Sequence, residues 1–258
     1  MTRRRWIADR VHDERAYLFG ANASHLALVL RAKTGQQFDV AVGGVVRLGT
    51  ITSITPDQVE FSLGSEIESE PVPEIHVLLS IFKFDRLEWA IEKLTELGVA
   101  GITTMIARRT EPHLAKAAAK RVERWRKLAH EAAQQARRLS TPEIPAPMLL
   151  KKAIPEVKGH RIVLSEVETG VGLKSALASC QAPITLAFGP EGGWTNEELQ
   201  LFQEAGWRSA SLGATILRAE TAAIAAVAIA MSELAGLAKS SAVRSSDASG
   251  APNSANDK

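Results

Sequence analysis

The chain has 258 residues, of which 45% are hydrophobic and 23% charged, close to the average for globular proteins. This composition excludes collagen-like, wholly disordered and coiled-coil proteins, and the length fits one large domain or two modest ones. The net charge of +2 excludes little by itself. The single cysteine, Cys180, excludes an intrachain disulfide and a cysteine-based zinc site, and it fits a reducing cytosol.

Residues 1–70 predict a small β-barrel. Short segments rich in β-branched residues, at 38–42, 45–51 and 58–63, are separated by turn signals. The exception is 24–31, which predicts a helix with Ser24 as its N-cap. The acidic, proline-containing stretch 64–73 is the expected linker to a second domain.

Residues 74–237 predict an α/β domain with a largely parallel sheet, because strand and helix patterns alternate. Leu87, Ile91 and Leu94 follow helical spacing, and Gly98 stands where a glycine ends a helix. In such sheets, ligands bind beyond the carboxyl ends of the strands. The expected strands are 75–81, 99–107, 161–165, 184–188 and 209–212, and the expected later helices are 112–138, 172–180, 195–205 and 220–237.

The two ends of the chain carry no predicted membrane or targeting segment. The charged N-terminus has no apolar core of the kind that secretory signals need. The longest apolar run, 222–231, has ten residues, about half of the ~20 that span a bilayer, so we expect a buried helix and a cytoplasmic protein. The Ser-rich and Ala-rich segment 238–258 predicts a disordered tail.

Two glycine-bearing loops follow predicted strands. In the first, strand 184–188 leads into Gly-Pro-Glu-Gly-Gly at 189–193, and Thr195 with Glu198 then forms a capping box at a helix start. In the second, Gly213 follows strand 209–212 and precedes a helix whose first turn holds a carboxylate. Glycines let a backbone approach a ligand closely, and neighbouring strands would bring both loops to one pocket. A tight structural turn is the alternative interpretation of each loop.

A basic stretch spans 108–138, with ten Lys and Arg against three Glu. A one-sided charge of this kind is typical of nucleic-acid contact, although a solvated helix face is the common alternative. The six histidines show no metal-binding spacing, and no nucleophile elbow is present, so metalloenzyme and hydrolase functions gain little support.

The loop sequences also carry a family resemblance. LAFGPEGGWTNEEL (186–199) followed by LGATILRAETA (212–222) resembles the SPOUT class of S-adenosylmethionine-dependent RNA methyltransferases, and within it the RsmE family, which methylates uridine at N3 in 16S rRNA. KFDRLEWAIEKLTELGV (83–99), the basic helix 124–144 and the N-terminal barrel sequence match the same family. The match covers about residues 1–237. One departure is Gln134-Gln135, where the family usually has Glu-Gln.

The resemblance implies a trefoil-knotted parallel-sheet domain over 74–237, preceded by a PUA-like RNA-binding barrel over 1–70. It also implies a homodimer without a metal, acting on the decoding-region uridine of the small ribosomal subunit. The cofactor would be S-adenosylmethionine, and by motif match its pocket would use these residues: Leu164, Gly189, Glu191, Gly192, Gly193, Leu212, Gly213, Ile216 and Leu217.

The same resemblance, with the charge pattern, suggests the residues that act on RNA. Arg218 is the expected stabiliser of the uracil anion, and Glu220 orients Arg218 or relays a proton, with helix capping as its alternative role. The expected RNA-binding residues are Arg3, Arg4, Arg5, Arg31, Arg108, Arg109, Arg124, Arg137 and Arg138.

Two other functions remain open at this point. One is a non-catalytic RNA-binding factor that keeps the fold, which the intact loop motifs disfavour. The other is a methyltransferase of the same class with another RNA target or a ribose hydroxyl as acceptor, which the barrel match disfavours. Cofactor binding discriminates the first alternative, and analysis of the product nucleoside discriminates the second.

Overall fold

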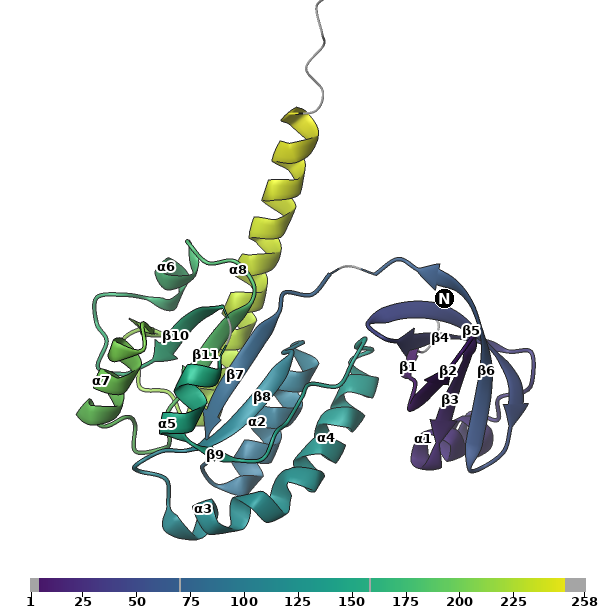
Figure 1. Cartoon of the computed structure of the whole chain (residues 1–258), viewed down its shortest axis with the longest axis horizontal. Coiled ribbons are helices and arrows are strands. Elements are labelled where there is room, and N and C mark those ends of the chain that lie inside the picture. The colour runs from purple at the N-terminus through teal and green to yellow at the C-terminus, as the bar shows by residue number, and fades with distance from the viewer. Residues whose placement is uncertain (1–4, 70, 158, 249–258) are drawn as a thin grey trace, which may run out of the picture.

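The computed structural model describes residues 5–69, 71–157 and 159–248, with the backbone alone for 237–248. The described strands form two separate six-stranded sheets. Figure 1 shows the first sheet as an N-terminal unit beside a larger unit that contains the second sheet and most helices. This division follows the predicted change of rhythm near residue 74.

The N-terminal unit is a curled sheet with strand order β1-β4-β5-β6-β3-β2. β1 pairs with β4 in parallel and the other neighbours are antiparallel. Leu18, Val40 and Phe61 are fully buried inside it, as alternating side chains of a curled sheet require. This arrangement is consistent with the predicted barrel. The strands are β1 (Arg5–Ile7), β2 (Arg10–His12), β3 (Arg15–Phe19), β4 (Gln37–Val42), β5 (Val45–Ile54) and β6 (Gln58–Ile67).

Two predictions for this unit were wrong in detail. The helix begins at Gly20, so α1 (Gly20–Ser24) continues into a π-helical segment (His25–Val29), and Ser24 is not an N-cap. Its hydroxyl instead donates to the Pro56 carbonyl oxygen at 2.7 Å. β6 also continues into the expected linker as far as Ile67, because Ile67 still pairs with β5.

The second sheet has the order β12-β10-β11-β7-β8-β9, with every pair parallel. This confirms the predicted parallel α/β fold, and the trefoil knot stays a prediction. The strands are β7 (Ile75–Ser80), β8 (Gly101–Ile106), β9 (Met148–Leu149), β10 (His160–Leu164), β11 (Ile184–Phe188) and β12 (Arg208–Ala210). The helices are α2 (Phe84–Glu96), α3 (Pro112–Ala118), α4 (Val122–Gln135), α5 (Leu150–Ala153), α6 (Leu173–Leu177), α7 (Asn196–Glu204) and α8 (Ala219–Ala248).

Helices cover this sheet because their apolar positions recur at helical spacing. Leu87, Ile91 and Leu94 of α2 are fully buried against the sheet, and Gly98 ends the segment with φ +100° as the pattern predicted. Burying a side chain of this size contributes about 2 kcal/mol. The central strand β11 is buried at all five positions, as expected for a strand covered on both faces.

The long C-terminal helix α8 packs its first half against the same core. Ala223, Val227 and Ala230 are fully buried there. By length and composition alone, the window Ala219–Gly236 would also be long and apolar enough to cross a membrane, with 33% of it buried. Since α8 contributes these side chains to the main core, we interpret it as a core helix, as the sequence predicted.

The end of α8 differs from the sequence prediction of a disordered tail over 238–258. The helix continues to Ala248, and Figure 1 shows it projecting beyond the body of the protein. Alanine has the strongest helix propensity, and a helix that is already nucleated extends readily. The rest of the predicted tail, 249–258, lies outside the described residues.

The two units meet along a polar seam between β1 and α4. The Gln134 side-chain oxygen accepts from the Ile7 N–H at 3.1 Å, and its amide nitrogen donates to the Ile7 carbonyl oxygen at 3.5 Å. Asn22 lies 3.2 Å from the His130 ring nitrogen Nε2, and Arg5 donates to the Arg137 carbonyl oxygen at 2.8 Å. Gln134, the departure from the family pattern, thus satisfies both backbone groups of one residue in an edge strand.

Candidate active site

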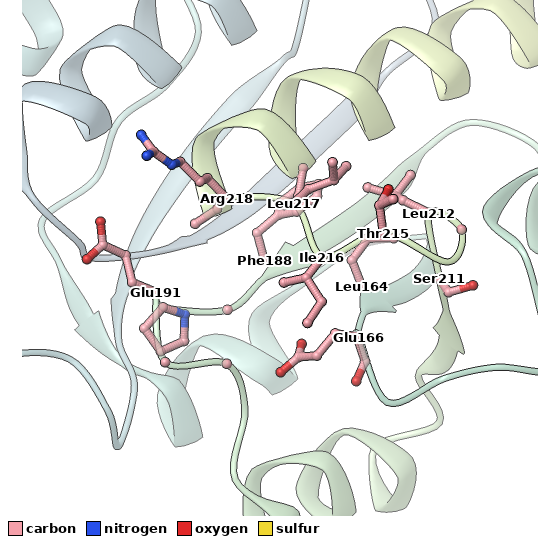
Figure 2. A pocket seen from close by; sticks show the side chains of 18 of the residues that line it. Leu164, Glu166, Phe188, Glu191, Ser211, Leu212, Thr215, Ile216, Leu217 and Arg218 are labelled. Carbon is pink, nitrogen blue, oxygen red and sulfur yellow. The ribbon is translucent and has the colours of Figure 1, made fainter.

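The pocket that both glycine-bearing loops line lies at the carboxyl ends of three neighbouring strands and has a volume of about 450 Å³. β10 lies between β11 and β12, so the loops that follow these strands converge as the sequence predicted. The pocket wall includes all nine residues expected at the cofactor: Leu164, Gly189, Glu191, Gly192, Gly193, Leu212, Gly213, Ile216 and Leu217. Figure 2 shows Glu191 and Arg218 at one end of the pocket and Ser211 and Leu212 at the other.

Close packing fixes the first loop, 189–193. A Cβ atom on Gly189 would lie 3.2 Å from the Trp194 ring, whose Nε1 donates to the Leu164 carbonyl oxygen at 2.9 Å. Gly193 has φ +70°, and a Cβ there would lie 2.1 Å from the Glu166 carboxylate. Position 193 therefore requires glycine, a Cβ on Gly189 would crowd the Trp194 ring, and the loop presents backbone to the pocket.

Two further contacts hold this loop from outside the pocket. Arg109 donates through Nη1 to the carbonyl oxygens of Gly192 at 2.6 Å and Trp194 at 3.2 Å. The predicted capping box is confirmed: the Thr195 hydroxyl accepts from the Glu198 N–H at 3.2 Å, and Glu198 accepts from the Thr195 N–H at 2.9 Å. The loop is thus anchored at its end to the start of α7.

The second loop, 211–218, covers the pocket with small and apolar residues. Gly213 adopts φ +120°, a conformation that side chains strongly disfavour. Ile216 is 87% exposed, and Figure 2 shows its side chain directed towards Glu166. Glu166 and Ser165 also line the pocket, and the Ser165 hydroxyl is buried without a hydrogen-bond partner. Sequence analysis missed both, although Ser165 ends the predicted strand 161–165 and Glu166 directly follows it.

Arg86 links the first loop to the start of α8 and was also missed. It lies in the first turn of α2 and lines the pocket. Its Nη1 donates to the Glu191 carboxylate at 2.8 Å, and its Nε lies 3.8 Å from a Glu220 oxygen. The signal available in the sequence was its position in 83–99, a segment that the resemblance already matched.

The two residues expected to act on the base occupy different environments. Arg218 lines the pocket beside the start of α8. Glu220 lies behind the wall, 5% exposed, and its second carboxylate oxygen is buried without a hydrogen-bond partner. The structure therefore places a cation at the pocket and a buried carboxylate close behind it, with Arg86 beside that carboxylate.

The residues expected to contact RNA do not form one surface. Arg3 and Arg4 lie outside the described residues, Arg5 and Arg137 lie at the seam, and Arg31 is exposed on the N-terminal unit. Arg108 and Arg109 are exposed near the pocket. Arg124 is 62% exposed, but its Nε donates to both oxygens of Glu88 at 2.9 Å.

Arg138 is held by backbone carbonyl groups of the protein itself. It donates to the carbonyl oxygens of Thr95, Gly98 and Val99, which lie at the end of α2. Burial lowers the pKa of Arg138 to about 10, so the side chain still carries its charge at neutral pH. The carbonyl oxygens at a helix C-terminus favour such a cation. Among the described residues, no three His, Cys, Asp or Glu side chains gather as metal ligands.

Comparisons with known proteins give the family. Residues 68–231 match the model of the RNA methyltransferase domain. A ribosomal RNA small subunit methyltransferase E of Synechocystis is 31% identical over 231 residues, covering 85% of this chain and 74% of that protein. The protein with the same name from Mycobacterium bovis is 31% identical over 221 residues, covering 82% and 84%.

Solved structures agree with this sequence relationship. A ribosomal RNA small subunit methyltransferase E from Neisseria gonorrhoeae, bound to S-adenosyl methionine, has a TM-score of 0.74 at 26% identity and covers 88% of this chain and 96% of that one. A putative methyltransferase from Legionella pneumophila, in complex with S-adenosylmethionine, has a TM-score of 0.76 at 28% identity and covers 90% and 98%. This chain therefore belongs to the RNA methyltransferase family that includes the ribosomal RNA small subunit methyltransferase E proteins.

Proposed function

We propose that this protein transfers a methyl group from S-adenosylmethionine to N3 of a uridine in 16S rRNA, the decoding-region uridine that the RsmE resemblance implies. One observation carries the proposal: two glycine-bearing loops from separate parts of the chain, 189–193 and 211–218, converge with Leu164 on one pocket. Relatives that match most of the chain are named as ribosomal RNA methyltransferases, and two similar structures hold the cofactor.

The residues of the pocket fit S-adenosylmethionine. A volume of about 450 Å³ lies in the usual range for small-molecule sites. Leu164, Leu212 and Leu217 offer apolar contact for an adenine ring, and the glycine loops offer backbone N–H and C=O groups. Glu166 and the unpartnered Ser165 hydroxyl supply polar groups for hydroxyl or ammonium groups of the ligand. When bound there, the cofactor supplies an electrophilic methyl group.

The chemistry of uracil N3 assigns the tasks of the remaining side chains. N3 carries a proton at neutral pH and becomes a good nucleophile only as that proton leaves. The Arg218 guanidinium, which cannot lose its own proton, stabilises the negative charge that develops on the base. Glu220, which is buried behind the pocket wall, orients Arg218 and is the nearby carboxylate that relays a proton. Holding the base in near-attack geometry contributes much of the rate.

The RNA partner is the small ribosomal subunit or its rRNA in the cytoplasm. The pairing edge of uracil, which includes N3, is hidden in helical RNA, so the target nucleotide must be unpaired or extruded. The exposed Arg108 lies beside the pocket, and Arg31 lies on the N-terminal unit that we propose as the PUA-like barrel. Arg138 is left out of this contact set because backbone carbonyl oxygens hold it.

We also propose a trefoil-knotted homodimer, as the resemblance implies. Ile216 and Val167, on loops at the pocket, are 87% and 66% exposed in the single chain, which is costly for large apolar side chains. A second copy that covers the pocket mouth would remove them from water. Sedimentation equilibrium of the full chain tests this, and a monomer at micromolar concentration would contradict it.

The decisive experiment transfers labelled methyl from S-adenosylmethionine to small ribosomal subunits from a strain that lacks this gene. Digestion to nucleosides identifies the product. Labelled 3-methyluridine at one site is the expected result. Label on another base or on a ribose would favour the methyltransferase with a different target. A folded protein that binds RNA but no cofactor would favour the non-catalytic binding factor.

A further inference from the structure

The outward face of β2 and β3 carries an aromatic and cationic surface that the proposed reaction does not use. In β3, Ala16 and Leu18 are fully buried, so the alternate residues Tyr17 and Phe19 lie on the outer face. All three residues of β2 are exposed, and this strand forms the edge of the sheet. Arg10 of β2 stands directly opposite Tyr17 in the strand register.

These three side chains form one cluster, which we call the Tyr17 platform (Arg10, Tyr17 and Phe19). The two rings are almost parallel, with 7° between their planes and 6.2 Å between their centroids. The Arg10 guanidinium carbon lies 5.1 Å from the Tyr17 centroid and 5.2 Å from the Phe19 centroid. Both rings are half-buried, so the platform keeps area in contact with water.

Arg10 and Arg15 lie on the same face, but only Arg15 has a carboxylate partner among the described residues. Arg15, in β3, is paired with Glu60 at 2.7 Å. Within the described part of the chain, Arg10 makes no ion pair or hydrogen bond with a carboxylate, and its guanidinium lies over the Tyr17 and Phe19 rings. Its positive charge therefore remains available to an anionic ligand such as a phosphate.

The platform adjoins the seam with the basic helix. The Asp9 carboxylate accepts from the Phe19 N–H at 2.8 Å, and its other oxygen lies 4.0 Å from the His130 ring nitrogen Nε2 in α4. Figure 1 shows the ends of β10 and β11, where the pocket lies, on the other side of α4 from the N-terminal unit. A ligand on the platform is therefore distant from the reacting base.

We propose that the Tyr17 platform binds the base of an unpaired nucleotide of the RNA substrate at a distance from the methylated uridine, with Arg10 facing its phosphate. Unpaired bases stack on aromatic rings and guanidinium planes, and such stacking tolerates any base because each has a π face. A protein partner would need an apolar or acidic complement, whereas a parallel pair of rings with one free cation matches a nucleotide. This inference rests on the proposed function, since RNA is the substrate there.

The test measures the affinity of the full-length protein for small ribosomal subunits and for a fluorescent single-stranded oligouridylate. Tyr17→Leu should weaken RNA binding about 5-fold to 150-fold, the usual effect of losing one stacked base. Tyr17→Phe, which keeps the ring, should bind like the unchanged protein. Arg10→Gln should weaken binding and lower the salt dependence by about one phosphate contact.

Arg15→Gln is the matched control, because it removes the same charge from the same face at a residue already paired with Glu60. It should change RNA affinity less than Arg10→Gln does. Circular dichroism melting and S-adenosylmethionine binding, measured on every variant, should stay unchanged.

Unchanged RNA affinity in Tyr17→Leu, or equal losses in Arg10→Gln and Arg15→Gln, would overturn the platform while leaving the proposed methyl transfer intact. If the protein without any substitution bound neither small ribosomal subunits nor the oligouridylate, both proposals would be overturned.

Discussion

Arg86 is the residue that links the first loop of the pocket to the start of α8. It donates to Glu191 of the first loop and lies beside Glu220, just behind the second. Glu220 is nearly buried, and a buried carboxylate that loses its neighbouring cation is strongly disfavoured. The Arg86 guanidinium thus connects the position of Glu191 in the first loop with the buried carboxylate of Glu220.

Replacement of Arg86 by Ala should weaken S-adenosylmethionine binding, because the first loop loses its anchor. The Arg86–Glu191 pair is about one-third exposed, so we expect a loss of about 1 kcal/mol, or about fivefold in Kd. Isothermal titration calorimetry measures this. Glu191→Gln should reproduce most of the loss, and the double variant should add little to either single one. Additive losses would show that the pair is not coupled.

Arg218 leads to a different prediction, because in the proposed reaction it stabilises the base and takes no part in anchoring the loop. Arg218→Ala should lower kcat by about 100-fold or more while changing the cofactor Kd little, since the charge it stabilises exists only in the transition state. Single-turnover methyl transfer and cofactor titration separate the two effects. Equal losses in both would make Arg218 a binding residue.

At the scale of elements, sequence patterns predicted the strands, helices and caps whose formation is determined by residues close together in the sequence. The buried strand β11, the amphipathic helix α2 with Gly98 at its end, and the Thr195 capping box all carry strong local signals. β1 and β2 have three residues each, too few for a period, and were missed. The Arg86–Glu191 contact joins residues 105 positions apart, so only the fold reveals it.

The capping box gives a prediction for the start of α7. Thr195→Ala should lower the free energy of unfolding by about 1 kcal/mol, because the Glu198 N–H loses its acceptor, the Thr195 hydroxyl. Urea unfolding followed by circular dichroism measures this change. Thr195→Ser keeps the accepting oxygen and should restore most of the stability, so an equal loss in the serine variant would exclude the cap as the cause.

At the scale of the whole molecule, the seam at α4 sets how the N-terminal unit sits against the catalytic unit. Gln134 pairs with both backbone groups of Ile7, and His130 lies beside Asn22 and Asp9. An RNA that contacts both units at once gains affinity only if their relative position is correct. We therefore expect the residues of the seam to affect substrate recognition without touching the pocket.

Gln134→Glu tests this coupling. A carboxylate still accepts from the Ile7 N–H but cannot donate to its carbonyl oxygen, so docking should weaken by about 1 kcal/mol. We expect a higher KM for small ribosomal subunits and unchanged cofactor affinity. The exposed neighbour changed in the same way, Gln135→Glu, controls for the added negative charge. Equal effects of the two variants would indicate charge repulsion from RNA instead of altered docking.

The strand order of the second sheet has a consequence for how the protein is made. β7 pairs on one side with β8, which follows it closely, and on the other side with β11, whose residues are synthesised about a hundred positions later. The sheet of the N-terminal unit uses only residues 5–67 and is complete early. A nascent chain therefore exposes one edge of β7 until Phe188 has left the ribosome, and such unpaired edges favour aggregation. The catalytic pocket, closed by residues up to Ala222, is among the last features of the chain that can form.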